Sequence, residues 1–456
     1  MQIDNAVSPV SETGSVVAVA IFLTAIALFL AATFILSHIF SPRRRGPVKA
    51  MPYESGMDPV GEARYRINPR FYLIALIFLL FDVELAFFYP WARLLGSGEL
   101  PSHEQTILFV GMIGFACMVY HDYHRFGRPR MLRLVVFASL LLLALTFIPP
   151  FRLTMNGAPR WIGMGPVSFQ PSEFAKFALV LLLAVRLTQH QEKILNFGTG
   201  FVMPFALAGV FVSIILMQKD IGIPFVMLAT TFILVWVAGG RKLYLFLCSI
   251  LCFIGGCVLI SMYSYRMERI MALGDPFKYR DTIGYHLTQS LSAFAQGGFW
   301  GRGAGAGEQK LGYLPAAHTD FIFAMLGEEF GLIGTITTVL LFLGMLYIAL
   351  RIAANAPDLF GFLLATGITM LLLVQAAFIM AVNLGLAPTK GLPLPFVSYG
   401  GSALIVSLSM MGILVNIGIQ GELAQSETRA GIASKVLRPP ISSSRPRLTP
   451  TFRVKA

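Results

Sequence analysis

The chain has 456 residues, of which 56% are hydrophobic and only 13% are charged, and its mean hydropathy is +0.72. This apolar surface exceeds what one water-soluble core hides, so the composition excludes an ordinary soluble protein and predicts a membrane protein. The formal net charge is +12. Because the basic residues collect in short loops, membrane topology explains them and no nucleic-acid partner is required.

Apolar runs recur along the chain, each near the length of about 20 residues that crosses a bilayer. We expect spans at roughly 15–40, 71–92, 105–120, 131–149, 174–188, 201–217, 221–239, 242–264, 320–351, 360–382 and 398–420. The first run lacks the basic start and the cleavage site of a signal peptide, so we expect a retained helix. The predicted fold is all-α, a polytopic bundle of about eleven transmembrane helices with a long extracytoplasmic loop over residues 265–319.

Lysine and arginine concentrate in loops that fall on one side of this bundle. They follow the first, third and seventh spans, around Arg43, Arg125 and Arg241, and they recur in the C-terminal tail. Since short basic loops stay in the cytoplasm, the pattern predicts an N-terminus outside the cytoplasmic membrane and a C-terminus in the cytoplasm. The tail, residues 423–456, is rich in Ser, Pro and Arg and is expected to be disordered.

Asp320 lies where a glycine-rich polar stretch, residues 296–320, meets the apolar run that begins at Phe321. An ionisable side chain at the mouth of a membrane helix is costly unless it is paired or functional, so Asp320 is the first site candidate. The glycines allow close approach to a ligand, and Arg302 and Lys310 are cations that hold anionic oxygens. A solvated basic loop is the alternative interpretation. The glycine spacing does not match a dinucleotide-binding loop.

Three further polar segments fall on the same predicted outer face. Residues 150–172 carry Trp161 and lead directly to Glu173, although Glu173 also suits a helix N-terminus electrostatically. Gln218-Lys219-Asp220 interrupts the apolar sequence between two spans. Residues 388–401 are rich in Pro and Gly, include Lys390 and Ser398, and predict a re-entrant hairpin, which is tolerated at membrane depth only when it lines protein or water. The convergence of Glu173, Asp220, Asp320 and Lys390 predicts a site at the outer face.

These segments resemble the SEDS family, the FtsW and RodA peptidoglycan glycosyltransferases, over about residues 104–420. The resemblance is carried by Trp161-Ile162-Gly163, Gln170-Pro171-Ser172-Glu173, Gly284-Tyr285 with Gln289-Ser290, the stretch from Gln309-Lys310 to Glu329, and Pro388 to Gly401. It implies about ten spans and polymerisation of lipid II outside the cytoplasmic membrane. The essential extracytoplasmic aspartate of the family falls on Asp320, and its motif lysine on Lys390.

The implied chemistry needs a base and positive charge. Asp320 is the candidate catalytic base toward a sugar hydroxyl, and the diphosphate of the leaving group is offset by cations or by a bound divalent cation. Displacement at an α-linked donor gives a β-linked glycan by inversion. The candidate substrate-binding residues are Trp161, Glu173, Asp220, Arg302, Lys310, His318, Lys390 and Ser398. The resemblance also implies a class B penicillin-binding transpeptidase as partner.

Two positions depart from the family pattern. Ala316 stands where the family commonly has Glu, which removes a helper carboxylate. Lys219 stands where it commonly has Pro. The four cysteines lie inside apolar runs, where cysteine usually behaves as a small hydrophobe, so neither a disulfide framework nor a cysteine metal cluster is predicted.

The N-terminal part resembles a different protein. Pro52-Tyr53-Glu54-Ser55-Gly56-Met57-Asp58-Pro59 and the stretch from Phe81-Asp82-Val83-Glu84 to Tyr89-Pro90-Trp91-Ala92 resemble NuoA, the small three-span membrane subunit of the proton-pumping NADH:quinone oxidoreductase. In that resemblance Asp82 and Glu84 are the intramembrane acids, and a functional or partner-pairing role explains two acids in one apolar helix better than packing does. Quinone and the other NADH:quinone oxidoreductase subunits are implied only if this segment assembles in the respiratory complex.

The expected organisation is a fusion of three parts: a NuoA-like segment at 1–103, a glycosyltransferase domain at 104–422 and the tail at 423–456. Alternatively, the NuoA-like segment extends to about residue 122. Three functions remain open. The first is a lipid II polymerase, and the second is a membrane subunit of the respiratory complex. The third is a lipid II flippase or inactive scaffold for the transpeptidase.

Overall fold

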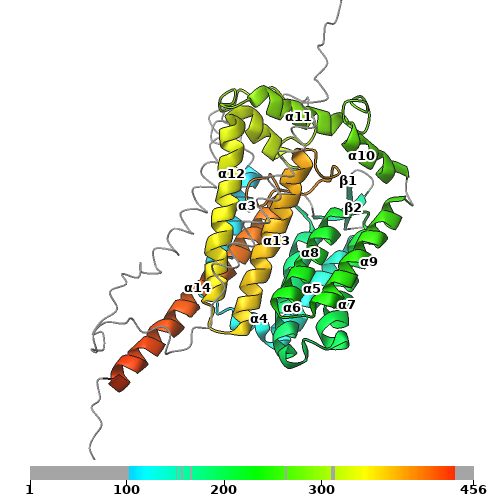
Figure 1. The fold of residues 1–456 in the computed structure, drawn as a ribbon. Coiled ribbons are helices and arrows are strands. Elements are labelled where there is room, and N and C mark those ends of the chain that lie inside the picture. The colour runs from blue at the N-terminus through cyan, green and yellow to red at the C-terminus, as the bar shows by residue number, and fades with distance from the viewer. Residues whose placement is uncertain are drawn as a thin grey trace, which may run out of the picture. The chain divides into compact units, whose positions relative to one another are not determined.

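The computed structural model describes residues 102–149, 151–155, 158–164, 167–261, 264–309 and 314–436, which belong to one compact unit (Figure 1). The expected spans at 15–40 and 71–92, the acids Asp82 and Glu84, and Lys310 lie outside the described residues. Every expected span inside them is a helix. These helices are α3 (Ser102–Tyr120), α5 (Pro129–Leu145), α6 (Pro171–Gln189), α7 (Met203–Met217), α8 (Gly222–Val237), α9 (Lys242–Ser261), α12 (Ile322–Ala354), α13 (Leu359–Asn383) and α14 (Gly401–Val436).

Length and composition mark four segments among the described residues as able to cross a membrane. They are Phe197–Met217, Ile322–Ala354, Leu359–Asn383 and Gly401–Ser426. Shorter apolar helices, among them Gly222–Val237, accompany them. The first of the four includes a short π-helical turn, η3 (Phe197–Val202), which runs into α7. A multi-pass helical membrane bundle is therefore the architecture.

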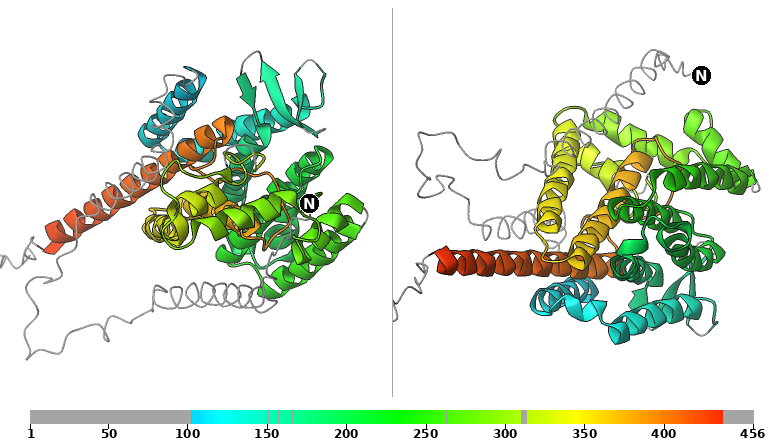
Figure 2. Two further views of the ribbon diagram at one scale, coloured as in Figure 1. Left: turned by 90° about the horizontal axis from the view of Figure 1, so that it is seen from above. Right: turned by 60° about the horizontal axis from the view of Figure 1, so that its bottom comes forward.

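The centre of the bundle is α6, which is apolar on nearly every side and buried along almost its whole length. A helix that is hydrophobic all round belongs inside a core, and α5, α7, α8 and α13 pack around it. At another side, α3 lies along α14 (Figure 2). A Cβ atom at Gly412 would lie 2.5 Å from the Phe115 carbonyl oxygen. Small residues at this contact permit the close helix packing that membrane proteins use.

Three segments differ from the sequence-based expectation. Residues 150–172 contain a three-stranded antiparallel sheet, β1 (Arg152–Met155), β2 (Ala158–Met164) and β3 (Val167–Phe169), so the fold is not purely α. The predicted long loop contains two helices, α10 (Ser264–Gly274) and α11 (Tyr285–Gly297). The first part of the predicted tail is helical, because residues 423–436 continue α14 with good helix formers such as Ala, Glu and Leu.

The hairpin before α14 and the short helix α4 lie at opposite ends of the bundle. Ile107 near the start of α3 contacts Gly401 at the start of α14, beside the hairpin that precedes α14. At the other ends of the same two helices, the Tyr123 amide donates to Asn416 Oδ1 at 3.1 Å. The short helix α4 (His124–Gly127), with Arg125, therefore lies at the end opposite the hairpin, as Figure 1 shows.

Helix α12 is broken at Gly331, whose backbone angles are φ 65° and ψ −156°. This conformation is essentially restricted to glycine and costs another residue about 1–3 kcal/mol. A Cβ atom there would also lie 2.4 Å from the Gly301 nitrogen and 2.6 Å from the Phe299 carbonyl oxygen. The break lets the glycine-rich segment lie directly against the helix.

We expect Gly331→Ala to lower the free energy of unfolding by about 3 kcal/mol, from backbone strain and overpacking together. Thermal unfolding of the purified protein in detergent measures the effect. The matched control is Gly255→Ala, because a Cβ atom on Gly255 of α9 would meet nothing within 4 Å. Equal midpoints for the two variants would contradict the role of the break.

Candidate active site

Asp320 ends a tight turn directly before α12. Donors from other elements fix this turn by hydrogen bonds to its backbone carbonyls. The His318 carbonyl accepts from the Tyr399 amide at 3.0 Å, and the Thr319 carbonyl accepts from the Ser398 hydroxyl. The carbonyl of Asp320 itself accepts from Asn383 Nδ2 at 3.0 Å. Three consecutive carbonyls are thus held by the hairpin and by α13, which fixes the position from which the Asp320 carboxyl projects.

Asn383, the last residue of α13, is completely buried and connects three elements. Besides holding the Asp320 carbonyl, its side chain accepts from the Ala324 amide at 3.1 Å in the first turn of α12. Its own carbonyl accepts from Ser290 Oγ of α11 at 2.7 Å. Asn383 therefore positions Asp320. The sequence alone does not indicate this role, because an amide side chain is ordinary at the end of a helix.

The predicted hairpin, residues 388–400, has no helix or strand and is pressed into the protein. Leu392 and Leu394 are each 1% exposed, and the Leu394 amide donates to Ser398 Oγ at 2.7 Å. A Cβ atom at Gly391 would lie 2.6 Å from Asp320 Oδ2. The Asp320 carboxyl therefore packs against the hairpin backbone, next to Lys390.

The environment of the Asp320 carboxyl favours its protonated form. Burial raises the pKa of Asp320 to about 6, and the negative charge of Asp220 adds to the rise. A hydrogen bond from Thr319 and the positive charge of Arg160 oppose it. A carboxyl whose pKa lies near neutrality is suited to general base catalysis.

Arg160 is the residue at this site that the sequence reasoning missed. It projects from β2, and its guanidinium lies 3.7 Å from Asp220 Oδ2 and donates to the Lys219 carbonyl. Asp220 also accepts from the Gly222 amide at the start of α8, at 3.0 Å. Lys219 adopts a φ of 59°, which proline cannot adopt, so this departure from the family pattern does change the local backbone. Neighbouring Trp161 is partly exposed on the same strand.

Glu173 is engaged inside the bundle. Both Glu173 and Lys176 are 2% exposed, and Lys176 Nζ lies 2.8 Å from Glu173 Oε2 within α6. Lys176 also donates to Gln375 of α13, whose Nε2 donates to the Pro393 carbonyl at 2.7 Å. This buried chain joins α6, α13 and the hairpin, and it gives Glu173 a defined structural partner.

The glycine-rich segment before Asp320 folds around two carboxylates of the protein itself. Glu328 Oε1 accepts from the Glu308 amide at 2.7 Å, and Glu329 Oε2 accepts from the Gly305 amide at 2.9 Å. Arg302 lies 2.8 Å from Glu308 Oε1 and 3.9 Å from Glu328 Oε1. The amides and the cation that the sequence suggested for a ligand therefore contact Glu308, Glu328 and Glu329.

A second group at the Asp320 end of the bundle is formed by α10 and α11. The Arg269 guanidinium donates to the Thr389 carbonyl at 2.6 Å, directly before Lys390. The His286 ring stacks on Phe321, with centroids 5.9 Å apart, and burial followed by the charge of Arg269 lowers its pKa. These helices therefore contact the hairpin and the start of α12 through the Arg269 guanidinium and the His286 ring.

The site residues thus fall into two sets. Asp320, Asp220, His318, Ser398 and Lys390 belong to the turn, the hairpin and their immediate neighbourhood, together with Arg160. Glu173 and Arg302 have partners in separate networks. Ala316 forms the turn with a left-handed φ of 55°. Among the described residues, no group of three or more His, Cys, Asp or Glu side chains gathers to hold a metal ion.

Comparison with known proteins shows the family to which this chain belongs. Residues 71–422 match the model of the FtsW, RodA and SpoVE cell cycle proteins. The chain belongs to this family. The SEDS resemblance is thereby confirmed. The match begins at residue 71 and not at the expected 104, so it includes part of the segment for which a NuoA-like module was predicted.

Individual relatives in the FtsW, RodA and SpoVE family agree. The probable peptidoglycan glycosyltransferase FtsW of Geobacter sp. (strain M18) is 41% identical, over 69% of this chain and 85% of its own length. Stage V sporulation protein E of Bacillus subtilis is 35% identical, over 77% of this chain and 97% of its own length. A chain of a solved peptidoglycan synthase complex that coordinates polymerization and crosslinking has a TM-score of 0.64 and 28% identity, covering 76% of this chain and 97% of that chain.

Proposed function

We propose that this family member is a peptidoglycan glycosyltransferase of the cell membrane that polymerises lipid II. The observation that carries the proposal is the Asp320 carboxyl. Its backbone is fixed by hydrogen bonds that the carbonyls of residues 318–320 accept, and its pKa is raised to about 6. The names of the relatives support the reaction class. Reconstitution of the purified chain with lipid II tests it, by the appearance of glycan strands.

In the proposed reaction, Asp320 takes the proton from the hydroxyl of the acceptor sugar. The hydroxyl oxygen forms a bond to the anomeric carbon of the donor sugar, and the bond from that carbon to the diphosphate breaks. The electron pair leaves with the undecaprenyl diphosphate, and attack from the opposite face inverts the configuration. A positioned base contributes roughly 10²–10⁴-fold to such a step.

The growing charge on the diphosphate requires compensation. Arg160 and Lys390 are the side chains we assign to it, because Arg160 acts on the Asp320 carboxyl electrostatically and Lys390 adjoins Gly391, which packs on that carboxyl. A divalent cation is the alternative, since Asp220, Asp320 and diphosphate oxygens are the hard ligands that Mg²⁺ prefers. Loss of polymerisation on chelation, restored by Mg²⁺, distinguishes the alternative from arginine and lysine alone.

The pH dependence of polymerisation should follow the charge around Asp320. A base with a pKa of about 6 is protonated below that pH, so the rate falls as the pH drops through 6. Arg160→Gln removes a charge that stabilises the carboxylate and should move this acid limb to higher pH. Asp220→Asn removes a repelling charge, keeps an acceptor for the Gly222 amide, and should move the limb to lower pH.

The readout is the initial rate of lipid II consumption between pH 4.5 and 8 for the wild type, Arg160→Gln and Asp220→Asn. Opposite shifts of the two variants support Asp320 as the titrating base. Shifts in the same direction, or a limb that neither variant moves, would show that another group controls the rate.

The partner and the orientation follow from the same proposal. The solved synthase complex coordinates polymerization with crosslinking, which supports a penicillin-binding transpeptidase as partner. The described basic loops, around Arg125 and Arg241, lie at the end opposite Asp320, which supports a cytoplasmic position for them and an outer-face position for the site. By this orientation the C-terminus is cytoplasmic.

For the N-terminal segment we propose a NuoA-like module fused to the glycosyltransferase. Its support is the sequence around Asp82 and Glu84. Measurement of the mass of the native membrane protein tests the fusion. One polypeptide of 50.0 kDa supports it, and two separate products would refute it.

A further inference from the structure

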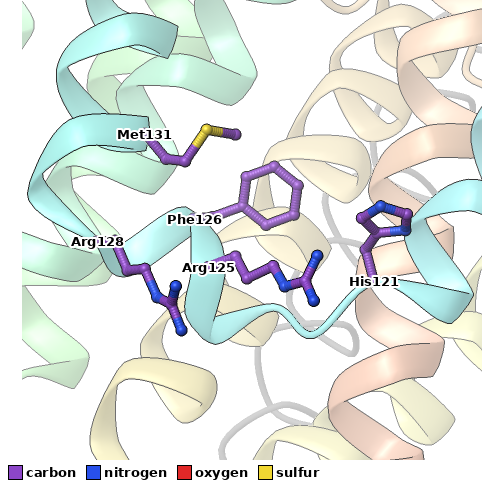
Figure 3. A pocket seen from close by; sticks show the side chains of 5 residues that line it. All are labelled: His121, Arg125, Phe126, Arg128 and Met131. Carbon is purple, nitrogen blue, oxygen red and sulfur yellow. The ribbon is translucent and has the colours of Figure 1, made fainter.

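The end of the bundle opposite Asp320 contains a cavity of about 330 Å³ lined by His121, Arg125, Phe126, Arg128 and Met131. Figure 3 shows the Arg125 side chain extending from α4 in the direction of His121, with Phe126 and Met131 on the apolar part of the lining. The cavity lies between the end of α3 and the start of α5. It combines two permanent positive charges with an apolar wall.

The positive charge here is not balanced by neighbouring acids. Arg125, Arg128, Arg130 and Arg133 are all exposed, and within the described residues none of them forms an ion pair. Two acids of this end have other partners: Asp122 accepts from His124 and Gln420, and Asp358 accepts from Tyr123. The first turn of α5 has no acidic residue, although a helix start favours negative charge.

An apolar face leads away from the cavity along α5. Met131, Leu134, Phe137 and Leu141 are exposed large hydrophobic residues at the spacing of one helix face. Tyr120, at the end of α3, is 89% exposed, and exposed tyrosine is typical of the membrane–water interface. A ligand that fits both parts has an anionic head for the arginines and an acyl chain for the face of α5.

We propose that this cavity binds the phosphate head of an anionic phospholipid of the surrounding leaflet, with an acyl chain along Met131, Leu134 and Phe137. Arg125 and Arg128 contact the phosphate. Basic pockets at the ends of membrane helices recognise anionic headgroups in this way. The site is separate from Asp320 and does not depend on the proposed activity.

Native mass spectrometry of the full-length protein, titrated with phosphatidylglycerol and separately with phosphatidylcholine, tests the proposal. The wild type should bind phosphatidylglycerol more tightly than phosphatidylcholine. Arg125→Gln with Arg128→Gln should weaken phosphatidylglycerol binding about 30-fold, since each arginine near an anionic surface contributes about fivefold. Binding of phosphatidylcholine should not change.

The matched control is Arg130→Gln with Arg133→Gln, which removes the same charge from the first turns of α5, outside the cavity lining. It should retain most of the preference for phosphatidylglycerol. Equal losses in the two double variants, or no preference in the wild type, would overturn the proposal. Inorganic phosphate is the second arm: if it displaces phosphatidylglycerol at millimolar concentration, the cavity is a site for a soluble anion and the lipid assignment is wrong.

Discussion

Replacement of Asp320 with asparagine is expected to reduce lipid II polymerisation by roughly 10²–10⁴-fold, because the amide has nearly the shape of the carboxyl but cannot accept the proton of the sugar hydroxyl. The carboxyl is mostly shielded from water and its pKa is raised to about 6, so the neutral amide should not destabilise the fold. The measurement is the rate of lipid II consumption in proteoliposomes at saturating substrate, together with the thermal unfolding midpoint.

Asp275→Asn is the matched control for this change. Asp275 is an exposed acid after α10, and its side chain accepts a local amide, that of Lys278, at 3.2 Å. The control should retain the wild-type rate. If Asp320→Asn polymerised lipid II at the rate of Asp275→Asn, the assignment of Asp320 as base would be lost.

Replacement of Asn383 with alanine is expected to lower the polymerisation rate on the order of 10²-fold, since a shift of about 1 Å in a reacting group has an effect of that size. The variant removes the donor to the Asp320 carbonyl and the acceptor for the Ala324 amide. Leaving such buried groups without partners also lowers the free energy of unfolding by about 1–3 kcal/mol for each group. The rate constant and the pH–rate profile should both change, because the carboxyl is no longer held in the same environment.

Asn416→Ala separates positioning from stability. Asn416 is also buried, and its side chain donates to the Val119 carbonyl and accepts from the Tyr123 amide at the opposite end of the bundle. It should lose comparable stability while the pH–rate profile stays that of the wild type. If the two variants altered the rate and its pH dependence equally, Asn383 would have a structural role alone.

The nine described helices that match expected spans were predictable because each one carries the apolar run that a membrane requires. The bounds differ by a few residues, as at α13, expected at 360–382 and found at Leu359–Asn383. The three strands around Trp161 and the helices α10 and α11 were not predicted. These segments are short and partly polar, and their structure depends on the loops and helix ends against which they pack.

The candidate site was predictable where one residue is anomalous by itself, and not where two distant residues pair. Asp320 is an acid at a helix mouth, a feature that local sequence reveals. Arg160 was missed because its partners, the Lys219 carbonyl and Asp220, lie about 60 residues away and no local spacing links them. Arg302 was assigned to a ligand because its pairing with Glu308 and Glu328 arises only when the glycine-rich segment folds onto α12.

Polymerisation of lipid II by this chain is tested most directly with proteoliposomes that contain the purified chain and no other enzyme. The measurement is electrophoresis of the glycan products. We expect long glycan strands at pH 7, at which most of the Asp320 side chains are deprotonated given a pKa of about 6. An absence of strands from pH 5 to 9, with the protein folded and Mg²⁺ present, would contradict it.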